Sequence, residues 1–191
     1  SAIDRVVIMR RGLLMVGMLV MACVGYGLVS AHANLQRAEP QLLVLTPTRE
    51  LAIQLAEAMQ VYARHSPGFH VLPVYGGAGM DLQLKQLRRG VHAIVGTPGR
   101  ILDHLRRKTL KLGKLKAVVI DEADELLRMG FIDDVEEILG QCPAEKQVAM
   151  FSATLPQRIR HIVDRHLADA VEVKIKSKTV TVATVDQRYV E

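Results

Sequence analysis

The chain has 191 residues, of which 49% are apolar and 24% are charged. This length is typical of one domain. The apolar content excludes a disordered tail, because a disordered chain lacks the apolar surface that would offset the entropy of ordering. Two cysteines, Cys23 and Cys142, are too few for a disulfide framework, and the seven histidines are scattered. The sequence therefore predicts neither a disulfide-stapled fold nor a zinc site.

Charge is distributed unevenly along the chain, which has a formal net charge of +5. Residues 81–116 hold ten basic side chains and two acids, whereas residues 120–145 hold nine acids and one arginine, Arg128. Each run is either a solvated helix face or a functional surface, the basic one for phosphates and the acidic one for a cation. Aromatic residues make up only 4% of the chain. A nucleic-acid partner would therefore be held by its sugar-phosphate backbone rather than by base stacking.

The first predicted feature in chain order is an apolar window at residues 13–29, which contains no lysine, serine or threonine. It follows Arg10 and Arg11 and precedes Ala31-His32-Ala33. This layout fits a buried strand and helix of an α/β core, or a secretory signal peptide over residues 9–33 with an A-x-A cleavage site. At 17 residues the window is shorter than the about 20 that a membrane-spanning helix needs. We favour the core interpretation, which predicts no membrane partner.

After this window, short apolar runs alternate with amphipathic stretches. The runs at 42–46, 70–75, 93–96, 117–121, 148–151 and 171–175 are nearly continuous in apolar residues, as in strands buried on both faces. Between them apolar residues recur at helical spacing, as at Leu51, Leu55 and Met59. This alternation predicts a single α/β domain with a parallel sheet and helices on both faces. Residues 177–191 are polar and β-branched, which is typical of a linker or an edge strand.

Ligands of such sheets bind beyond the carboxyl ends of the strands, and two predicted strand ends carry acids and hydroxyls. The run at 117–120 is followed by Asp121-Glu122-Ala123-Asp124, and the run at 148–151 by Ser152-Ala153-Thr154. An apolar strand that ends in adjacent acids is a Walker-B arrangement, in which one carboxylate can hold Mg²⁺ through water and the next can orient or deprotonate an attacking water. The two hydroxyls can hydrogen-bond a neighbouring acid. Taken alone, an acidic pair is more often a helix cap.

Three other strand ends carry groups that bind phosphates. Their sequences are Thr46-Pro47-Thr48-Arg49-Glu50-Leu51, Gly76-Gly77 and Gly96-Thr97-Pro98-Gly99-Arg100. They place glycine amides, hydroxyls and arginines at predicted helix N-termini. Each motif by itself is more often a turn. Five motifs in this order, each at a strand end, predict one shared site.

Together the five motifs resemble those of the DEAD-box RNA helicase family. Pro47-Thr48-Arg49-Glu50-Leu51 resembles motif Ia, Gly76-Gly77 the GG motif, Thr97-Pro98-Gly99-Arg100 motif Ib, Asp121-Glu122-Ala123-Asp124 motif II and Ser152-Ala153-Thr154 motif III. Arg128-Met129-Gly130-Phe131 and the basic stretch are similar to the bacterial cold-shock members. The resemblance covers residues 39–191. It implies the first of two RecA-like domains of the P-loop NTPase superfamily at 39–176, and at 177–191 a linker toward a second RecA-like domain.

The resemblance also implies a cytoplasmic ATP-dependent RNA helicase, in which RNA-stimulated ATP hydrolysis opens a duplex locally. Asp121 would hold Mg²⁺ through water, Glu122 would activate the attacking water, and Asp124 would bond Ser152 and Thr154. The residues implied to contact the RNA backbone, in a sequence-tolerant way, are Pro47, Thr48, Arg49, Gly76, Gly77, Thr97, Pro98, Gly99 and Arg100.

Residues 1–38 depart from the family pattern and form an atypical apolar N-terminal segment. The family has a G-x-x-x-x-G-K-[ST] loop there, and this sequence has none. Ser1-Ala2-Ile3-Asp4 resembles the adenine-reading Q motif with Asp4 in place of glutamine, so Ile3 and Asp4 are weak candidates for ATP contact. Without the loop lysine we expect weak ATP binding and little hydrolysis. The alternative function is a catalytically inactive half-helicase that binds RNA backbone or a protein.

Overall fold

The computed structural model describes residues 5–10, 39–167 and 170–175. The strands are β1 (Arg5–Arg10), β2 (Leu42–Leu45), β3 (Val71–Val74), β4 (Ala93–Gly96), β5 (Ala117–Ile120), β6 (Gln147–Ser152) and β7 (Ala170–Ile175). The helices are α2 (Arg49–Tyr62), α3 (Met80–Arg89), α4 (Pro98–Arg106), α5 (Ala123–Arg128), α6 (Ile132–Gly140) and α7 (Gln157–His166), with a short 3-10 turn, η1 (Ala63–His65). All six predicted strands are present within one or two residues of their predicted bounds.

These strands form one sheet in the order β3-β4-β2-β5-β6-β1-β7. β3, β4, β2, β5 and β6 pair in parallel, which confirms the predicted α/β fold with a RecA-like parallel sheet. The sheet differs from the prediction at β1, which was not among the predicted strands and lies antiparallel between β6 and β7. The predicted strand β7 therefore joins the sheet through an antiparallel pair. The run Val6-Val7-Ile8-Met9 is apolar throughout, so it has no alternating pattern that would separate a buried strand from a buried helix segment.

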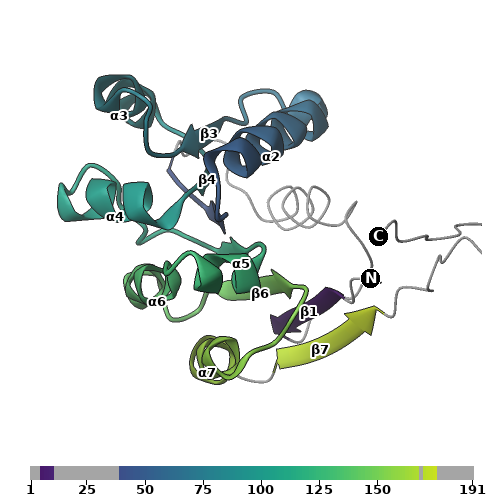
Figure 1. The fold of residues 1–191 in the computed structure, drawn as a ribbon. Coiled ribbons are helices and arrows are strands. Elements are labelled where there is room, and N and C mark those ends of the chain that lie inside the picture. The colour runs from purple at the N-terminus through teal and green to yellow at the C-terminus, as the bar shows by residue number, and fades with distance from the viewer. Residues whose placement is uncertain (1–4, 11–38, 168–169, 176–191) are drawn as a thin grey trace, which may run out of the picture.

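Helices cover both faces of the sheet (Figure 1). α3, α4, α6 and α7 lie on one face and α2 lies on the other. Because side chains alternate along a strand, each strand feeds both layers. Leu43 and Leu45 of β2 join the core beneath α4 and α6, while Leu42 and Val44 join a second core against α2. Both cores are apolar, and β2, β4 and β5 are buried along their whole length, so these central strands are fixed in place.

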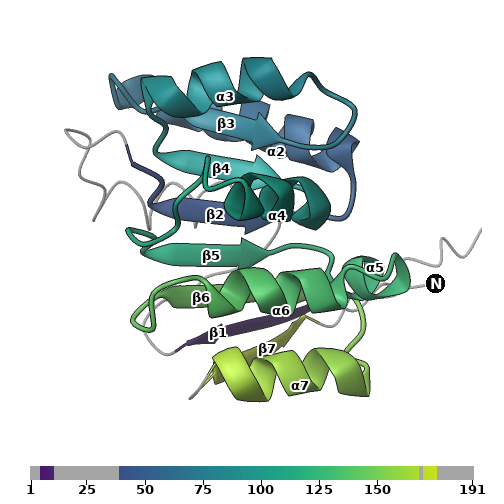
Figure 2. The ribbon, with the colours of Figure 1, turned by 90° about the vertical axis from the view of Figure 1, so that its left-hand side faces the viewer.

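The register aligns the carboxyl ends of the parallel strands. Leu45 of β2 pairs with Gly96 of β4 and with Ile120 of β5, and Gly96 also pairs with Val74 of β3. Ile120 pairs with Met150 of β6, two residues before that strand ends. Figure 2 shows these strand ends on the side of the sheet where α5 begins. Every predicted motif follows one of these ends, so the register brings them to one edge, which we call the carboxyl edge.

Some sequence predictions concern residues outside the described ranges. These are Ile3 and Asp4, Cys23, most of the atypical segment 1–38 with its apolar window, and the linker 177–191. Among the residues that are described, no helix is both long enough and apolar enough to cross a membrane.

Candidate nucleotide and nucleic-acid site

Backbone hydrogen bonds join the loops at the carboxyl edge to one another. The Thr46 amide donates to the Gly96 carbonyl at 3.0 Å, and the Thr97 amide donates to the Val74 carbonyl at 3.0 Å. The Asp121 amide donates to the Leu45 carbonyl at 2.9 Å. The sheet ladder thus continues one residue past three strands, and the first residue of each motif is held rigidly to its neighbour.

The acid pair lies at a sharp turn between β5 and α5. Glu122 has left-handed backbone angles, φ 48° and ψ 52°, which are uncommon for a residue other than glycine. Its amide donates to the Asp121 carboxylate at 3.0 Å, and its carbonyl accepts the Leu126 amide at 2.9 Å to begin α5. The turn leaves the Glu122 side chain exposed and the Asp121 side chain half-buried. Strained backbone of this kind is concentrated at functional sites.

Asp124 connects the acid turn to the end of β6. Its carboxylate accepts hydrogen bonds from the Ala153 amide at 3.4 Å, the Thr154 amide at 3.2 Å and the Thr154 hydroxyl at 3.1 Å. Its own amide donates to the Ser152 hydroxyl at 3.1 Å, and that hydroxyl donates to the Thr154 carbonyl at 2.6 Å. Burial acts to raise the pKa of Asp124, but the hydrogen bonds from Ser152, Thr154 and Ala153 outweigh it and lower that pKa below its ordinary value.

The loop after β2 begins α2. The Thr48 hydroxyl accepts the Leu51 amide at 3.2 Å, which is an N-cap. The Thr46 hydroxyl, fully buried, donates to the Thr48 carbonyl at 3.2 Å and shapes the turn. Arg49 is exposed at the first helical position, where it forms an ion pair with Glu50. The arrangement presents a guanidinium and helix-terminal amides to solvent, which suits an anionic ligand.

The loop after β3 lies against the start of α4. Gly77 has φ +85°, a left-handed conformation that disfavours any residue with a side chain. An Arg49 nitrogen, Nη1, lies 3.8 Å from the position that a Cβ on Gly77 would occupy. The Arg100 guanidinium donates to the Ala78 carbonyl at 3.1 Å. The loops of motifs Ia, GG and Ib are therefore neighbours.

The structure brings all the described candidate residues to the carboxyl edge, with differences in exposure. Thr48, Arg49, Gly76, Gly77, Thr97, Gly99 and Arg100 have exposed or half-buried positions. Pro47 and Pro98 are buried. Pro98 stands at the first turn of α4, where its fixed φ suits the start of a helix. The RNA contact expected of Pro47 and Pro98 stays a prediction.

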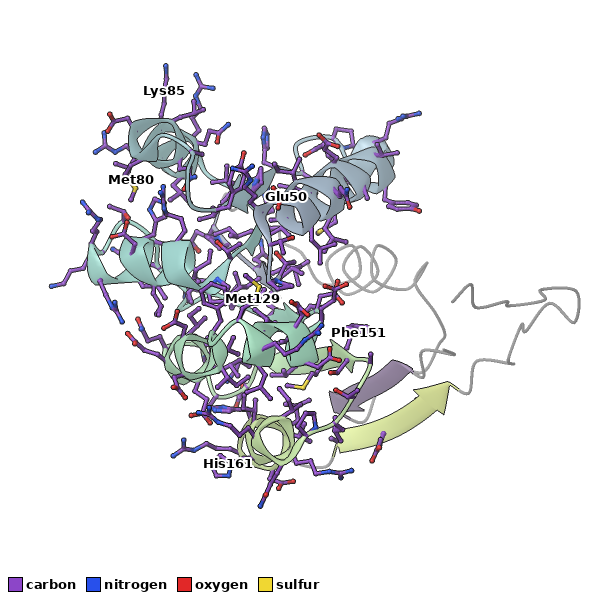
Figure 3. All side chains as sticks on the ribbon, viewed as in Figure 1. Glu50, Met80, Lys85, Met129, Phe151 and His161 are labelled. Atoms are coloured by element: carbon purple, nitrogen blue, oxygen red, sulfur yellow. The ribbon has the colours of Figure 1, made fainter. Side chains whose placement is uncertain are left out.

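The basic run does not form one continuous surface, contrary to the interpretation of it as a phosphate track. α4 carries the chain away from the carboxyl edge, so Lys108, Lys111 and Lys114 lie in the loop that enters the amino end of β5. In Figure 3, which looks onto the carboxyl edge, Lys85 projects from the outer side of α3. Only Arg100 of the basic run lies among the motifs.

The acidic run likewise divides. Asp121, Glu122 and Asp124 belong to the site. Further along, acids of α6 pair with arginines of neighbouring helices: Glu137 with Arg106 at 2.9 Å, Asp133 with Arg158 at 2.9 Å and Glu136 with Arg165 at 3.8 Å. The pairs of Glu137 and Asp133 lie on solvated helix faces, whereas Oε1 of Glu136 is buried. No group of three or more acidic, histidine or cysteine side chains converges on a metal position in the described part of the chain.

Sequence reasoning did not identify three polar residues behind the GG loop, namely Gln83, His104 and Thr109. Gln83 is the one buried residue of α3, and His104 lies on the buried face of α4 with Ile101 and Leu102. A polar residue inside an otherwise apolar helical stripe was the available signal.

The oxygen ligands at the acid turn suit a magnesium nucleotide. Mg²⁺ prefers carboxylate and water oxygens and keeps several of its waters. Asp121 offers a half-buried carboxylate at a strand end, beside the exposed Glu122, and these are the residues that would hold a hydrated ion.

The chain matches known proteins over most of its length. The family model for DEAD/DEAH box helicases matches residues 18–162, which includes part of the apolar window. The ATP-dependent RNA helicase DeaD of Buchnera aphidicola subsp. Acyrthosiphon pisum is 52% identical over 158 residues, which cover 83% of this chain and 26% of that protein. The protein of the same name from Escherichia coli K12 is 53% identical over 150 residues, covering 78% of this chain and 24% of that protein.

Solved structures agree with this match. A DEAD box protein from the hyperthermophile Methanococcus jannaschii is 43% identical with a TM-score of 0.64, over 67% of this chain and 35% of that one. A hypothetical ATP-dependent RNA helicase from Sulfolobus tokodaii is 32% identical with a TM-score of 0.70, over 82% of this chain and 44% of that one. The chain thus spans about a quarter of the length of the curated relatives. On these matches the chain belongs to the DEAD/DEAH box helicase family.

Proposed function

We propose that the chain is the N-terminal RecA-like domain of a cytoplasmic ATP-dependent RNA helicase, with residues 39–176 as the domain and 177–191 leading to a second RecA-like domain. One observation carries this proposal. The features that share one edge of the sheet are the acid turn, the Asp124 hub (Asp124 with its partners in residues 152–154) and the loops after β2, β3 and β4. Hydrogen bonds join neighbouring members of this set. RNA-stimulated ATP hydrolysis needs such a shared edge, because a change at the nucleotide must reach the RNA.

On the nucleotide side, Asp121 would hold hydrated Mg²⁺, which when bound neutralises charge on the phosphates. Glu122, exposed and beside it, would orient a water and accept its proton on the side-chain carboxylate. The strained turn keeps this carboxylate at the strand end, so no reorganisation is needed to place it.

Asp124, Ser152 and Thr154 would couple this chemistry to the rest of the molecule. In the proposed arrangement these three residues contact neither the nucleotide nor the RNA directly. They hold the acid turn to the end of β6 through the hydrogen bonds to Asp124. A movement of the acid turn would therefore shift the end of β6, and a movement of β6 would shift the acid turn.

On the RNA side, Thr48, Arg49, Gly77, Thr97, Gly99 and Arg100 would contact the sugar-phosphate backbone. Amides and guanidinium groups recognise phosphate oxygens without reading bases. Binding is therefore expected to be sequence-tolerant and to weaken as salt rises.

The test is RNA-stimulated release of phosphate from ATP by the chain, with a second RecA-like domain supplied in trans. The proposal predicts release that Glu122→Gln abolishes and that Glu125→Gln, three residues further along, retains. Absence of any release with both RNA and the second domain present would contradict the catalytic part of the proposal.

A second function is favoured by a specific observation. The sequence has no G-x-x-x-x-G-K-[ST] loop anywhere, and backbone amides and a lysine of that kind cradle nucleotide phosphates in P-loop proteins. The second candidate is a half-helicase that binds RNA backbone, or a protein, without hydrolysis. It predicts RNA binding that Arg49→Ala and Arg100→Ala weaken for all RNA sequences, together with no ATP turnover. Binding that depends on base sequence would contradict it.

A further inference from the structure

A buried polar network lies between α3 and α4, directly behind the GG loop. Gln83 is 3% exposed and His104 is fully buried. The Gln83 amide nitrogen donates to the Tyr75 carbonyl at 3.0 Å, and its oxygen lies 2.9 Å from His104 Nε2. On the other side of the ring, His104 Nδ1 lies 2.9 Å from the Thr109 hydroxyl. The network runs without a break from the loop after α4 to the loop after β3.

The bonding partners determine the proton positions. Because the Gln83 nitrogen donates to a carbonyl, its oxygen faces His104, so we assign the ring proton to Nε2. The Thr109 hydroxyl has one hydrogen and two acceptors within reach, His104 Nδ1 at 2.9 Å and the His104 carbonyl at 3.0 Å. Burial lowers the pKa of His104, with Arg100 and Arg107 acting in the same direction and Asp103 opposing them. Neutral His104 therefore donates from Nε2 to the Gln83 oxygen, and its Nδ1 shares the hydrogen of the Thr109 hydroxyl with the His104 carbonyl.

The network ends at the Tyr75 carbonyl, next to the GG loop, and this position suggests its role. Tyr75 immediately precedes Gly76-Gly77, and β3 is the edge strand of the described sheet, so the chain there has a neighbouring strand on one side only. Gly77 is left-handed and has no side chain to pack. Such a loop would sample many conformations unless other groups fixed its backbone.

We propose that Gln83, His104 and Thr109 are positioning residues that hold the Gly76-Gly77 loop at a fixed distance from the start of α4, so that the two loops grip one stretch of RNA backbone together. Gln83 fixes the loop at Tyr75, and Arg100 fixes it at Ala78. This inference rests on the proposed RNA contacts of these loops.

The polar composition of the network supports a positioning role over a packing role. Leucine at both buried positions would bury apolar area without needing partners, and buried polar groups cost free energy unless every one is bonded. Fully bonded, they fix one arrangement of the elements that they join. An apolar contact between α3 and α4 would hold the helices together without fixing the Tyr75 carbonyl.

The experiment measures two quantities on the 191-residue chain. The first is amide hydrogen exchange at residues 76–79 without RNA. The second is the Kd for a short fluorescein-labelled oligouridylate by anisotropy. The variants are Gln83→Leu, Thr109→Val, which removes only the hydroxyl, and His104→Gln, which can keep a donor toward Gln83. Gln86→Leu makes the same chemical change as Gln83→Leu one turn along α3. Leu102→Ala removes buried packing from α4 without removing a hydrogen bond.

In Gln83→Leu we expect faster exchange at 76–79 and a Kd raised about threefold to tenfold, the loss that corresponds to one hydrogen bond. Thr109→Val should shift both quantities in the same direction by less, and His104→Gln should leave both close to their values in the parent chain. Gln86→Leu and Leu102→Ala should leave exchange at 76–79 and the Kd unchanged, even where thermal stability falls. Unchanged exchange at 76–79 in folded Gln83→Leu and Thr109→Val would overturn the inference. If Gln83→Leu exchanges faster at 76–79 but the parent chain does not bind the oligouridylate, the proposed function is rejected, while the positioning of the Gly76-Gly77 loop by this network stands.

Discussion

The Asp124 hub gives the sharpest prediction for stability. Asp124→Ala removes three hydrogen bonds to one carboxylate, with donor distances of 3.1–3.4 Å. Hydrogen bonds to a charged group contribute about 1.5–3 kcal/mol each, and these are long and half-exposed, so we take about 1 kcal/mol each. The expected loss in the free energy of unfolding is about 2–3 kcal/mol. At about 2–4 °C per kcal/mol for a chain of this size, Tm should fall by about 4–12 °C.

The assay is urea unfolding followed by far-UV circular dichroism, because the chain has no tryptophan to report by fluorescence. Asp133→Ala is the matched control. Asp133 has one ion pair, with Arg158, and its side chain is 78% exposed, so its loss should cost about 0.5 kcal/mol. If Asp124→Ala costs no more than Asp133→Ala, the hub does not join the acid turn to β6 and the reasoning is wrong.

Three further predictions concern pH, packing and thiol chemistry. Because the folded-state pKa of Asp124 is lowered, its charge stabilises the fold fully above about pH 4, the unfolded value, and this contribution is lost as pH falls through the folded-state pKa. The stability difference between the parent chain and Asp124→Asn should therefore shrink below pH 4 in urea titrations. Gly96→Ala would place a Cβ 2.2 Å from the Val74 carbonyl oxygen, and we expect a loss of about 3 kcal/mol or failure to fold, measured by the same unfolding assay. Burial raises the pKa of Cys142 to about 11, so at pH 8 only about one thiol in a thousand is ionised, and its reaction with a disulfide reagent should be slow until the chain unfolds.

Each of these has a control. The pH series is compared with Asp133→Asn, whose difference from the parent should stay small throughout, and a gap at Asp124 that widens as the pH falls below 4 would contradict the assignment. Gly99→Ala has open space around the new Cβ, so equal losses at positions 99 and 96 would contradict the packing argument. The thiol assay uses a Cys23→Ser background, and reaction in folded protein as fast as in urea would contradict burial of Cys142.

The fold could be predicted from sequence because its strands are continuous apolar runs and its motifs lie at their ends. Burial on both faces gives a parallel strand a pattern that a single sequence displays, and Asp121, Thr46 and Thr97 each follow such a run by one residue. The parallel register then placed the motifs together without further information. β1 was not among the predicted strands, because Val6-Val7-Ile8-Met9 is apolar throughout and its sequence has no alternation that indicates a strand.

The sequence predicted which strand ends lie side by side better than it predicted how far apart two charged residues lie in the fold. Arg100 and Lys108 are eight residues apart, yet α4, about 13 Å long at 1.5 Å per residue, carries the chain between them to the other edge. Counting charge along the sequence therefore overestimated the phosphate-facing surface. The hydrogen-bonded network through His104 was missed because a histidine on a helix has many possible surroundings. Only the folded structure supplies its two partners, Gln83 from α3 and Thr109 from the loop after α4.

The central claim is that RNA lies along the carboxyl edge of the sheet. Ultraviolet cross-linking of the chain to oligouridylate, with the linked peptides identified by mass spectrometry, tests it most directly. The account predicts cross-links within residues 46–50, 75–78 and 97–100, reduced by Arg49→Ala and Arg100→Ala. Cross-links concentrated instead at residues 107–116, on the opposite edge, would contradict it.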